Sequence, residues 1–264
     1  MRLIIVCLMA LISSKNFAQT SSEFCGISNK CFQDNEVISY NIFYSVIGIY
    51  VNAGTATFTA NLEKFDNKPV YHFTGTGSSN PSYDWIFKVR DIYESYVDTV
   101  NLQPQKFSRR VDEGGYKISE DVSFNNATNT AVSNKGSYKI PQCTQDVLSA
   151  IYHSRNIDFS KYKVDDKIPF TMFLDNNVYN LYIKYLGRET IKTKYGKFRA
   201  IKFKPLLVKG TIFEGGEKMT VWVTDDANHI PIRIESPITV GSIKVDMMGY
   251  KNLRHPLTSL ISFR

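Results

Sequence analysis

The feature of this sequence that most constrains its fold is an alternation of apolar and polar residues, which starts at Glu36 and recurs along the chain. In the first run, Ile38, Tyr40 and Ile42 alternate with polar neighbours. Successive side chains of a β-strand point to opposite faces, so this period predicts strands with one buried face. Similar runs cover Thr55–Lys64, Val70–Gly75, Ile92–Thr99, Lys106–Val111, Tyr116–Phe124, Ile168–Phe173, Val178–Leu186, Lys197–Lys204, Lys218–Thr224, Ile230–Glu235 and Ser242–Tyr250.

Short polar or glycine-containing links separate these runs, among them FDNK, EGGY, NNAT, LDNN, KYGK and EGGE. About twelve strands with such links favour an antiparallel sheet that curls or closes. We therefore expect an all-β fold, mainly antiparallel, that forms a strongly curved sheet or a partly open β-barrel.

One packed α-helix is expected, at about 144–156 (TQDVLSAIYHSRN). Thr144 can cap its N-terminus, and Asp146 places negative charge in the first turn, where it suits the helix dipole. One helical face is apolar, which predicts packing on the sheet; its residues are Val147, Leu148, Ile151 and Tyr152. A shorter helical turn is expected after Ser79 or Asn80, with Pro81 at its first position.

Residues 1–18 have the pattern of a secretory signal peptide. Arg2 gives a basic start, Leu3–Ile12 is apolar, and Ala18 is the expected cleavage point. This segment is too short to span a membrane stably. We expect an N-terminal segment at 19–35, one β-rich domain at 36–253 and a C-terminal tail at 254–264. We expect an exported protein, periplasmic or extracellular, that is soluble rather than lipid-anchored and has no transmembrane segment once the signal is removed.

Three cysteines remain when Cys7 leaves with the signal, namely Cys25, Cys31 and Cys143. Export to an oxidising compartment favours disulfides, and we expect a Cys25–Cys31 bridge. Cys143 could instead be the true partner of either one. Three unclustered cysteines without a nearby histidine pair make a poor zinc site, so no metal is expected.

The net charge is +7, but the distribution of the basic residues argues against nucleic acid as a partner. The basic residues are scattered and mostly alternate with apolar ones, so no nucleic-acid groove is expected. A mild attraction to anionic surfaces is all that such a charge supports. The sequence also lacks a Gly-x-Ser-x-Gly elbow, a Walker loop and a His-Glu-x-x-His motif, and no cofactor is expected.

The stretch VWVTDDANHIPIRIES, Val221–Ser236, places two acids and a histidine between apolar runs. It could be a hydrolytic or metal site, or the polar tip of a β-hairpin. Pairing Val223 with Ile230 brings both apolar faces to one side and leaves Asp225–Asn228 as a four-residue turn, which suits Asp and Asn. We favour the hairpin, with His229 exposed at its tip.

The other face of this hairpin carries Trp222, opposite Pro231 and diagonal to Arg233 in the same register. An arginine that stacks on an exposed tryptophan gains about 0.5–1 kcal/mol. The pair is either an ordinary polar face with one aromatic lid or one wall of a ligand groove.

Two arginines occupy positions where apolar residues are expected. Arg155 lies within the apolar face of the expected helix, so it either extends to solvent at the helix end or enters the core and needs a carboxylate. Arg109 lies on the apolar face of its strand. If it pairs opposite Tyr96, Glu94 and Asp98 flank it and satisfy its charge.

Acid pairs near an arginine also occur in glycosidase clefts. A glycan hydrolase with Glu94, Asp98 or Glu113 as acid and base is therefore an alternative, and it requires two carboxylates that face one cleft.

Spaced segments across the chain carry a resemblance to one known family. They are YESYVDT at 93–99, Pro104, Phe107, Arg109, EGGY at 113–116, DVLSAIYHSR at 146–155, GRETIKTKYGKF at 187–198, Pro205, GTIF at 210–213, WVTDD at 222–226, Ile230, Pro231 and VGSIK at 240–244. Over about Tyr40–Tyr250, the chain resembles the bacterial exported family called domain of unknown function 3108. The resemblance implies an exported, β-rich envelope protein, and it brings no reaction, ligand or catalytic residue.

The aromatic content of 16 Tyr, 17 Phe and 2 Trp, together with arginines on apolar faces, suggests a function. We expect a non-enzymatic module that binds a lipid, another amphiphile, or an envelope polymer such as a glycan in the concave face of the sheet. The candidate ligand contacts are Trp85, Tyr93, Arg109, Arg155, Trp222 and Arg233. Besides the hydrolase, a structural or interaction protein that uses an exposed sheet edge is a further alternative.

Overall fold

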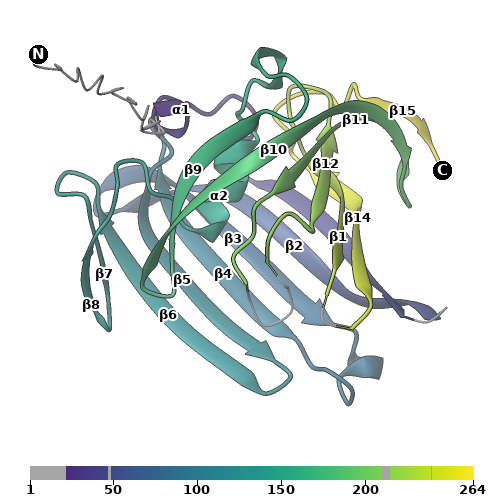
Figure 1. The fold of residues 1–264 in the computed structure, drawn as a ribbon, viewed down its shortest axis with the longest axis horizontal. Coiled ribbons are helices and arrows are strands. Elements are labelled where there is room, and N and C mark those ends of the chain that lie inside the picture. Colours follow the sequence, from purple (N-terminus) through teal and green to yellow (C-terminus); the bar gives the residue numbers. More distant parts are fainter. Residues whose placement is uncertain (1–21, 47–48, 210–214, 239) are drawn as a thin grey trace, which may run out of the picture.

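The computed structural model describes residues 22–46, 49–209, 215–238 and 240–264 (Figure 1). Its helices are α1 Ser22–Cys25 and α2 Val147–Ser154, with 3₁₀ turns η1 Pro81–Tyr83 and η2 Phe159–Lys161. Its strands are β1 Glu36–Val46, β2 Ile49–Phe65, β3 Lys68–Ser79, β4 Arg90–Asp98, β5 Pro104–Glu113, β6 Tyr116–Asn125, β7 Thr130–Ser133, β8 Gly136–Lys139, β9 Lys167–Leu174, β10 Asn177–Lys192, β11 Gly196–Pro205, β12 Thr220–Thr224, β13 Pro231–Pro237, β14 Ser242–Lys251 and β15 Leu260–Phe263.

The strands form one antiparallel sheet in the order β8-β7-β6-β5-β4-β3-β2-β1-β14-β13-β12-β11-β10-β9. Almost every neighbouring pair in this order is a hairpin, whereas the β1–β14 pair joins distant parts of the chain. The all-β expectation is therefore confirmed.

The two edges of the sheet approach each other because the sheet curves strongly (Figure 1). Phe173 of β9 packs its ring against those of Phe124 and Tyr138, on β6 and β8. In the β9–β10 turn, Asn176 accepts a hydrogen bond from the Ser133 hydroxyl at 2.5 Å. Side chains link the edges there, and the described strands form no β8–β9 ladder. The sheet is thus barrel-like but not closed, as predicted.

Helix α2 occupies one end of the space inside the curved sheet (Figure 1). Tyr152 stacks on Phe73 of β3 with ring centroids 3.8 Å apart, and Leu148 is buried in the same cluster. The helix is shorter than the expected 144–156, and its cap is Asp146 rather than Thr144.

Asp146 caps the N-terminus of α2. The Asp146 side chain accepts a hydrogen bond from the Ser149 N–H at 2.9 Å, and the Ser149 hydroxyl accepts one from the Asp146 N–H. This reciprocal capping satisfies two backbone donors. The Thr144 hydroxyl instead donates to the Pro141 carbonyl. The shorter turn expected near residue 80 is confirmed as η1, capped by Asn80.

The hairpin at 221–236 is confirmed, but its predicted register is wrong. Val223 lies opposite Pro231 and Val221 opposite Ile234, with a bulge between Trp222 and Val223. A bulge adds one residue to one strand, so it shifts every later pair. The alternation of apolar residues alone did not indicate it.

His229 is half-buried at this hairpin tip rather than exposed, which corrects the prediction for this residue. Its Nδ1 lies 2.6 Å from the Arg155 carbonyl, and burial lowers the pKa of its imidazole. Asn228 is fully buried, and its amide group bonds the backbone of His255. The turn therefore docks on the body of the protein.

The C-terminal residues, expected as a tail, include strand β15, which pairs with β11. Leu257 and Leu260 pack against the apolar cluster that contains Phe198 and Trp222. This segment covers part of the sheet.

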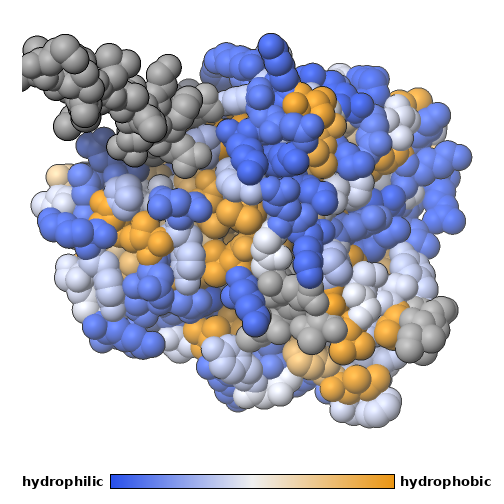
Figure 2. Space-filling view, in the orientation of Figure 1, coloured by the Kyte–Doolittle hydropathy of each residue, from blue (hydrophilic) through white to orange (hydrophobic). Residues whose placement is uncertain are grey.

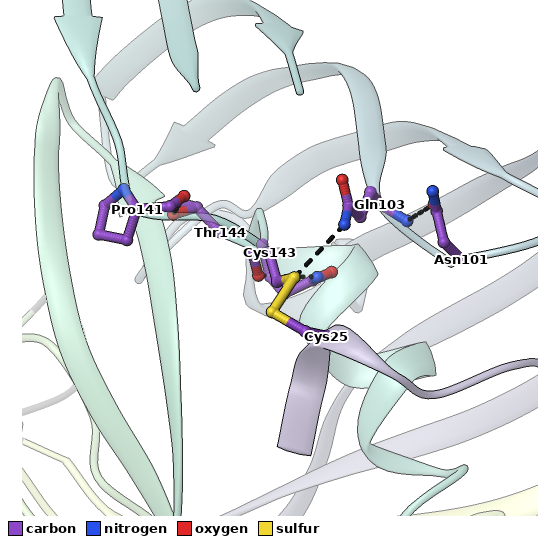
Figure 3. The surroundings of a disulfide bond; sticks show 7 residues. Cys25, Asn101, Gln103, Pro141, Cys143 and Thr144 are labelled. Atoms are coloured by element: carbon purple, nitrogen blue, oxygen red, sulfur yellow. Dashed lines mark hydrogen bonds between the residues drawn. A yellow bond between two sulfur atoms is a disulfide. The ribbon is translucent and has the colours of Figure 1, made fainter. Parts of the chain in front are cut away.

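The disulfide joins Cys25 to Cys143 rather than to Cys31, so the predicted pairing is wrong (Figure 3). It ties α1 to the segment just before α2, across a sequence separation of 118. Cys31 is a free, buried thiol that donates to the Arg155 carbonyl, and burial raises its pKa to about 11.

Candidate functional site: the open part of the concave face

The concave face can be traced across neighbouring strands by register. Phe58 of β2 lies opposite Gly75 of β3, Gly75 opposite Tyr93 of β4, and Tyr93 opposite Arg109 of β5. A Cβ atom added to Gly75 would lie 3.1 Å from the Leu148 side chain, so α2 covers the sheet here. This row marks where the filled end of the interior stops.

The next row, one step away from α2, has a floor of small residues. Ala56 lies opposite Gly77, and Gly77 opposite Asp91. A Cβ atom at Gly77 would have only the Asp91 Cβ within 4 Å, at 4.0 Å. The concave face above Gly77 is therefore open.

Half-buried apolar side chains line the opposite side of this floor. Ile42 of β1 lies opposite Val245 of β14, and Val245 opposite Ile234 of β13. All three are only partly buried, whereas Leu148 and Tyr152 of α2 and Phe73 beneath them are buried. The inner face thus changes from a packed core to a partly accessible apolar surface along each strand.

An acid pair lies beside the floor. Asp91 and Glu113 share a hydrogen bond between their side chains, and the Asp91 carboxylate also accepts one from the Asp112 N–H at 3.2 Å. Burial, followed by repulsion from Glu113, raises the pKa of Asp91 to about 7. The pair therefore holds a shared proton at mildly acidic pH.

An apolar lip borders the same end of the sheet. Trp85, Ile86 and Phe87 follow η1 in the β3–β4 link, and they are 83%, 63% and 45% exposed. Figure 2 shows hydrophobic side chains at the lower edge of the molecule, where this link lies in Figure 1. Adjacent exposed apolar residues of this kind mark a contact surface.

Arg109 is on the concave face, but the prediction that Glu94 and Asp98 flank it is wrong. Its guanidinium pairs with Glu120 of β6 at 2.7 Å and with Asp175 of the β9–β10 turn, and its side chain is 7% exposed. The strand register places it opposite Tyr93, not Tyr96. Two carboxylates of the protein compensate its charge, so Arg109 links the sheet edges.

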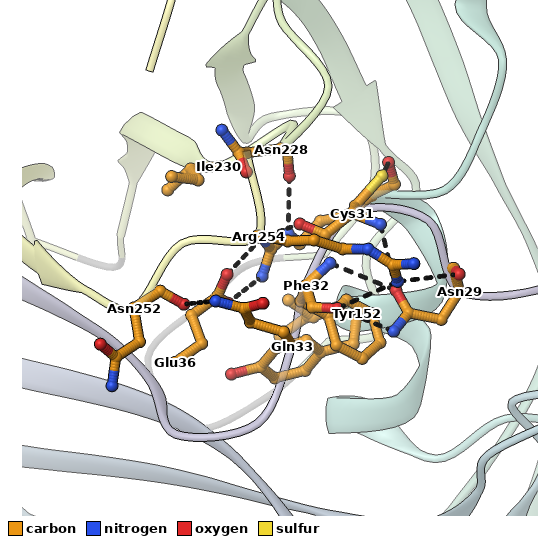
Figure 4. Close-up of polar contacts among 12 residues, drawn as sticks. Asn29, Cys31, Phe32, Gln33, Glu36, Tyr152, Asn228, Ile230, Asn252 and Arg254 are labelled. Carbon is orange, nitrogen blue, oxygen red and sulfur yellow. Dashed lines mark hydrogen bonds and ion pairs between the residues drawn. The ribbon is translucent and has the colours of Figure 1, made fainter. Parts of the chain in front are cut away.

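Arg155 is buried and paired, which resolves the two alternatives for this residue. It forms a bidentate pair with Glu36, with Nη1–Oε1 at 2.5 Å and Nη2–Oε2 at 3.0 Å, and its Nε donates to the Asn228 carbonyl. Burial disfavours its charge, but Glu36 outweighs this effect and raises the pKa of the guanidinium. Figure 4 shows Glu36, Cys31, Phe32 and Asn228 around this centre. It is part of the core.

Trp222 and Arg233 lie directly opposite each other on the convex face, not in the predicted diagonal arrangement. Trp222 is buried, and its indole N–H donates to Glu189 at 2.6 Å. Lys202, rather than Arg233, lies over its ring. Trp222 is therefore not exposed as the wall of a ligand groove would be.

The six candidate ligand contacts do not converge on one site. Tyr93 and Arg109 lie on the concave face, Arg155 lies beneath α2, and Trp85 lies in the lip. Trp222 and Arg233 lie on the convex face.

The sequence analysis did not select Gly77 and Asp91, which lie on the open part of the concave face. Two glycines spaced by one residue in a strand, Gly75 and Gly77, are the signal that indicates a bare sheet face.

The three carboxylates of the hydrolase hypothesis face different surroundings. Glu94 bonds His72 and Ser108 on the side of β4 away from the helix, and Asp98 accepts backbone N–H groups in the β4–β5 turn. Glu113 pairs with Asp91. The required arrangement of two of these acids in one cleft is not present in the described chain.

Within the described ranges, no group of three or more His, Cys, Asp or Glu side chains is arranged to hold a metal ion. No helix in this part of the chain is long and apolar enough to cross a membrane.

Comparison with known proteins identifies the family. Residues 39–248 match the model of a protein family of unknown function, DUF3108. The chain belongs to this family. No curated protein matches the sequence. The description of the DUF3108 family assigns no reaction or ligand.

A solved structure shares the fold of this DUF3108 protein at low sequence identity, and two others match it less well. A β-barrel-like protein of domain of unknown function DUF1849, from Brucella abortus, is 8% identical with a TM-score of 0.56, over 84% of this chain and 99% of that one. A protein from Bacteroides fragilis described as exported, with a YmcC-like fold, is 12% identical with a TM-score of 0.39, over 85% and 99%. One from Parabacteroides distasonis described as a lipoprotein is 12% identical with a TM-score of 0.36, over 84% and 100%.

Proposed function

We propose that this protein is a non-enzymatic, exported binding module that holds an amphiphile in the open part of its concave face. The observation that carries the proposal is the bare floor at Gly77, which lies between half-buried apolar residues and is not covered by α2. Ligand sites are typically concave and mainly apolar, with a few polar groups that fix orientation.

An acyl chain is the occupant that this lining favours. Ala56 and Gly77 leave room over the floor, and Ile42, Ile234 and Val245 offer apolar contact from the other side. Each buried methylene group of such a chain contributes about 0.8 kcal/mol.

The polar end of the amphiphile would lie near Asp91 and Glu113. At mildly acidic pH their shared proton leaves one carboxyl able to donate a hydrogen bond, which suits a hydroxyl, carbonyl or carboxyl group. The exposed lip at Trp85–Phe87 supports entry from an apolar phase, because these side chains can contact the ligand or its source before it reaches the floor.

Native mass spectrometry tests this proposal directly. The mature protein is exported to the periplasm of a bacterial host, purified without detergent, and analysed both intact and after extraction with organic solvent. The expected result is a co-purifying amphiphile that dissociates on denaturation. A homogeneous, ligand-free protein that also fails to bind dansyl-labelled undecanoic acid would overturn the proposal.

A further inference from the structure

A pocket of about 580 Å³ lies on the convex face of the sheet. The β10–β11 turn, β13, β14 and the residues after Ser259 converge on it. Six basic side chains line it, namely Lys192, Lys194, Lys197, Arg233, Lys244 and Arg264. The basic residues that are scattered in the sequence are thus brought together by the fold.

The carboxylates nearby do not neutralise this group. Asp246 is the acidic side chain that lines the pocket, and both of its oxygens are engaged. Arg233 donates to them at 2.7 and 2.9 Å, and the Lys194 N–H donates at 3.1 Å. Glu235 pairs with Lys244 at 2.9 Å. The described structure gives no ion pair to three of the remaining cations, Lys192, Lys194 and Lys197.

The lysines are held on a well-defined turn. The Thr193 hydroxyl is buried and accepts the N–H groups of Tyr195 and Gly196, each at 3.2 Å, while the Thr193 N–H donates to the Gly196 carbonyl. The Lys194 ammonium lies over the stacked rings of Phe43 and Tyr50, 5.3 and 5.7 Å from their centroids. Less side-chain entropy is then lost when an anion binds.

We infer that this convex pocket, which we call the basic pocket, binds a phosphate-bearing polyanion. Three lysines without carboxylate partners around one concave surface create a local positive potential, and phosphate groups accept hydrogen bonds from several such donors at once. The exposed rings of Tyr50 and Phe263 at its border can contact the organic part of the ligand. The phosphate is either free or part of a lipid headgroup, and these two sources are separable by experiment.

The experiment uses the full mature protein and two probes. Sodium tripolyphosphate, followed by isothermal titration calorimetry, represents a soluble phosphate. Phosphatidylcholine vesicles with phosphatidylglycerol, followed by co-sedimentation, represent a lipid headgroup. The double variant Lys192→Gln/Lys197→Gln is compared with Lys64→Gln/Lys68→Gln, which removes the same charge at the exposed β2–β3 turn.

The pocket variant should weaken binding of the preferred probe by about 25-fold, since each of the two charge contacts near solvent is worth roughly fivefold in affinity. The control variant should bind like the wild type. Saturable binding of tripolyphosphate identifies a soluble ligand, and binding to vesicles alone identifies a headgroup. Equal loss in both variants, or no binding of either probe, would overturn the inference.

Discussion

The sequence predicted that Arg155 lies on the apolar face of its helix, but it did not indicate which carboxylate pairs with this residue. Its helical position puts it on the apolar face, so it must either leave the core or find a carboxylate there. The carboxylate belongs to Glu36, 119 residues earlier, at the start of β1. No local pattern indicates such a long-range contact, because it depends on how the sheet curves over α2.

Replacement of Arg155 by methionine should destabilise the fold by about 3–5 kcal/mol, because Glu36 is then left as an unpaired buried charge. Urea denaturation of the wild type and of Arg155→Met measures this difference. The double variant Glu36→Gln/Arg155→Met should recover part of the loss. If the double variant is as unstable as the sum of both single variants, the coupling between the two residues is absent.

The acid pair on the concave face makes the stability depend on pH. The folded-state pKa of Asp91 is raised from 3.8 to about 7, so between these values the native state binds more protons than the unfolded chain. The free energy of unfolding therefore falls as pH rises from about 4 to about 7. Asp146, whose pKa burial raises to about 6, contributes with the same sign.

The variant Asp91→Asn should flatten this pH dependence and become more stable than the wild type above about pH 7. Thermal unfolding from pH 4 to 8 measures both effects, with Asp66→Asn in the exposed β2–β3 turn as the control. An unchanged slope in Asp91→Asn would show that this carboxyl does not hold the proton in the folded protein.

At the scale of elements, hairpins were predictable and their registers were not. The turn at Asp225–Asn228 follows from its residue types, but Val223 faces Pro231 rather than Ile230. The bulge beside Trp222 adds one more residue to this shift, so Val221 faces Ile234 rather than Ile232. The helix start moved to Asp146 for a similar reason, since a capping box with Ser149 outweighs the isolated Thr144. Local alternation indicates which residues share a face, while hydrogen bonds in turns decide the pairing.

The disulfide also belongs to this scale, because it ties α1 to the segment that leads into α2. Short spacing favoured Cys25–Cys31, but Cys31 lies in the core beside Arg155 and Cys25 meets Cys143 through the fold. A bridge that closes a loop of this length restricts the unfolded chain strongly.

The variant Cys25→Ser/Cys143→Ser should therefore lower the free energy of unfolding by about 2–5 kcal/mol. Guanidinium denaturation under non-reducing conditions measures the loss. In the native wild type, Cys31 should not react with Ellman's reagent, because it is buried and its pKa is raised to about 11. Rapid labelling of two or more thiols before unfolding would contradict the pairing.

At the scale of the whole molecule, the curved antiparallel sheet was predictable from alternation and short turns. The division of its concave face into a filled part and an open part was not predictable from the sequence. That division depends on where α2 ends, and on the absence of a side chain at Gly77, one row away from it. The expected arginines serve as ion-pair partners, so the proposed site rests on shape and apolar lining instead.

Two glycines allow a matched test of this site. Gly77 lies on the concave face of β3. Gly249 of β14 pairs with Ser39, one residue out of phase with the buried Ile38 and Tyr40, and a Cβ atom there would meet no neighbour within 4 Å. The Cβ atom of a leucine is therefore free of close contacts at both positions, and the two variants differ in the face on which the side chain lies.

Fluorescence titration with dansyl-labelled undecanoic acid should separate Gly77→Leu from Gly249→Leu. Gly77→Leu should weaken binding by about tenfold or more, because its side chain occupies the space of several methylene groups of the ligand. Gly249→Leu should bind like the wild type, and melting temperatures check that both variants are folded. Equal affinity in all three proteins would contradict an amphiphile site on the concave face.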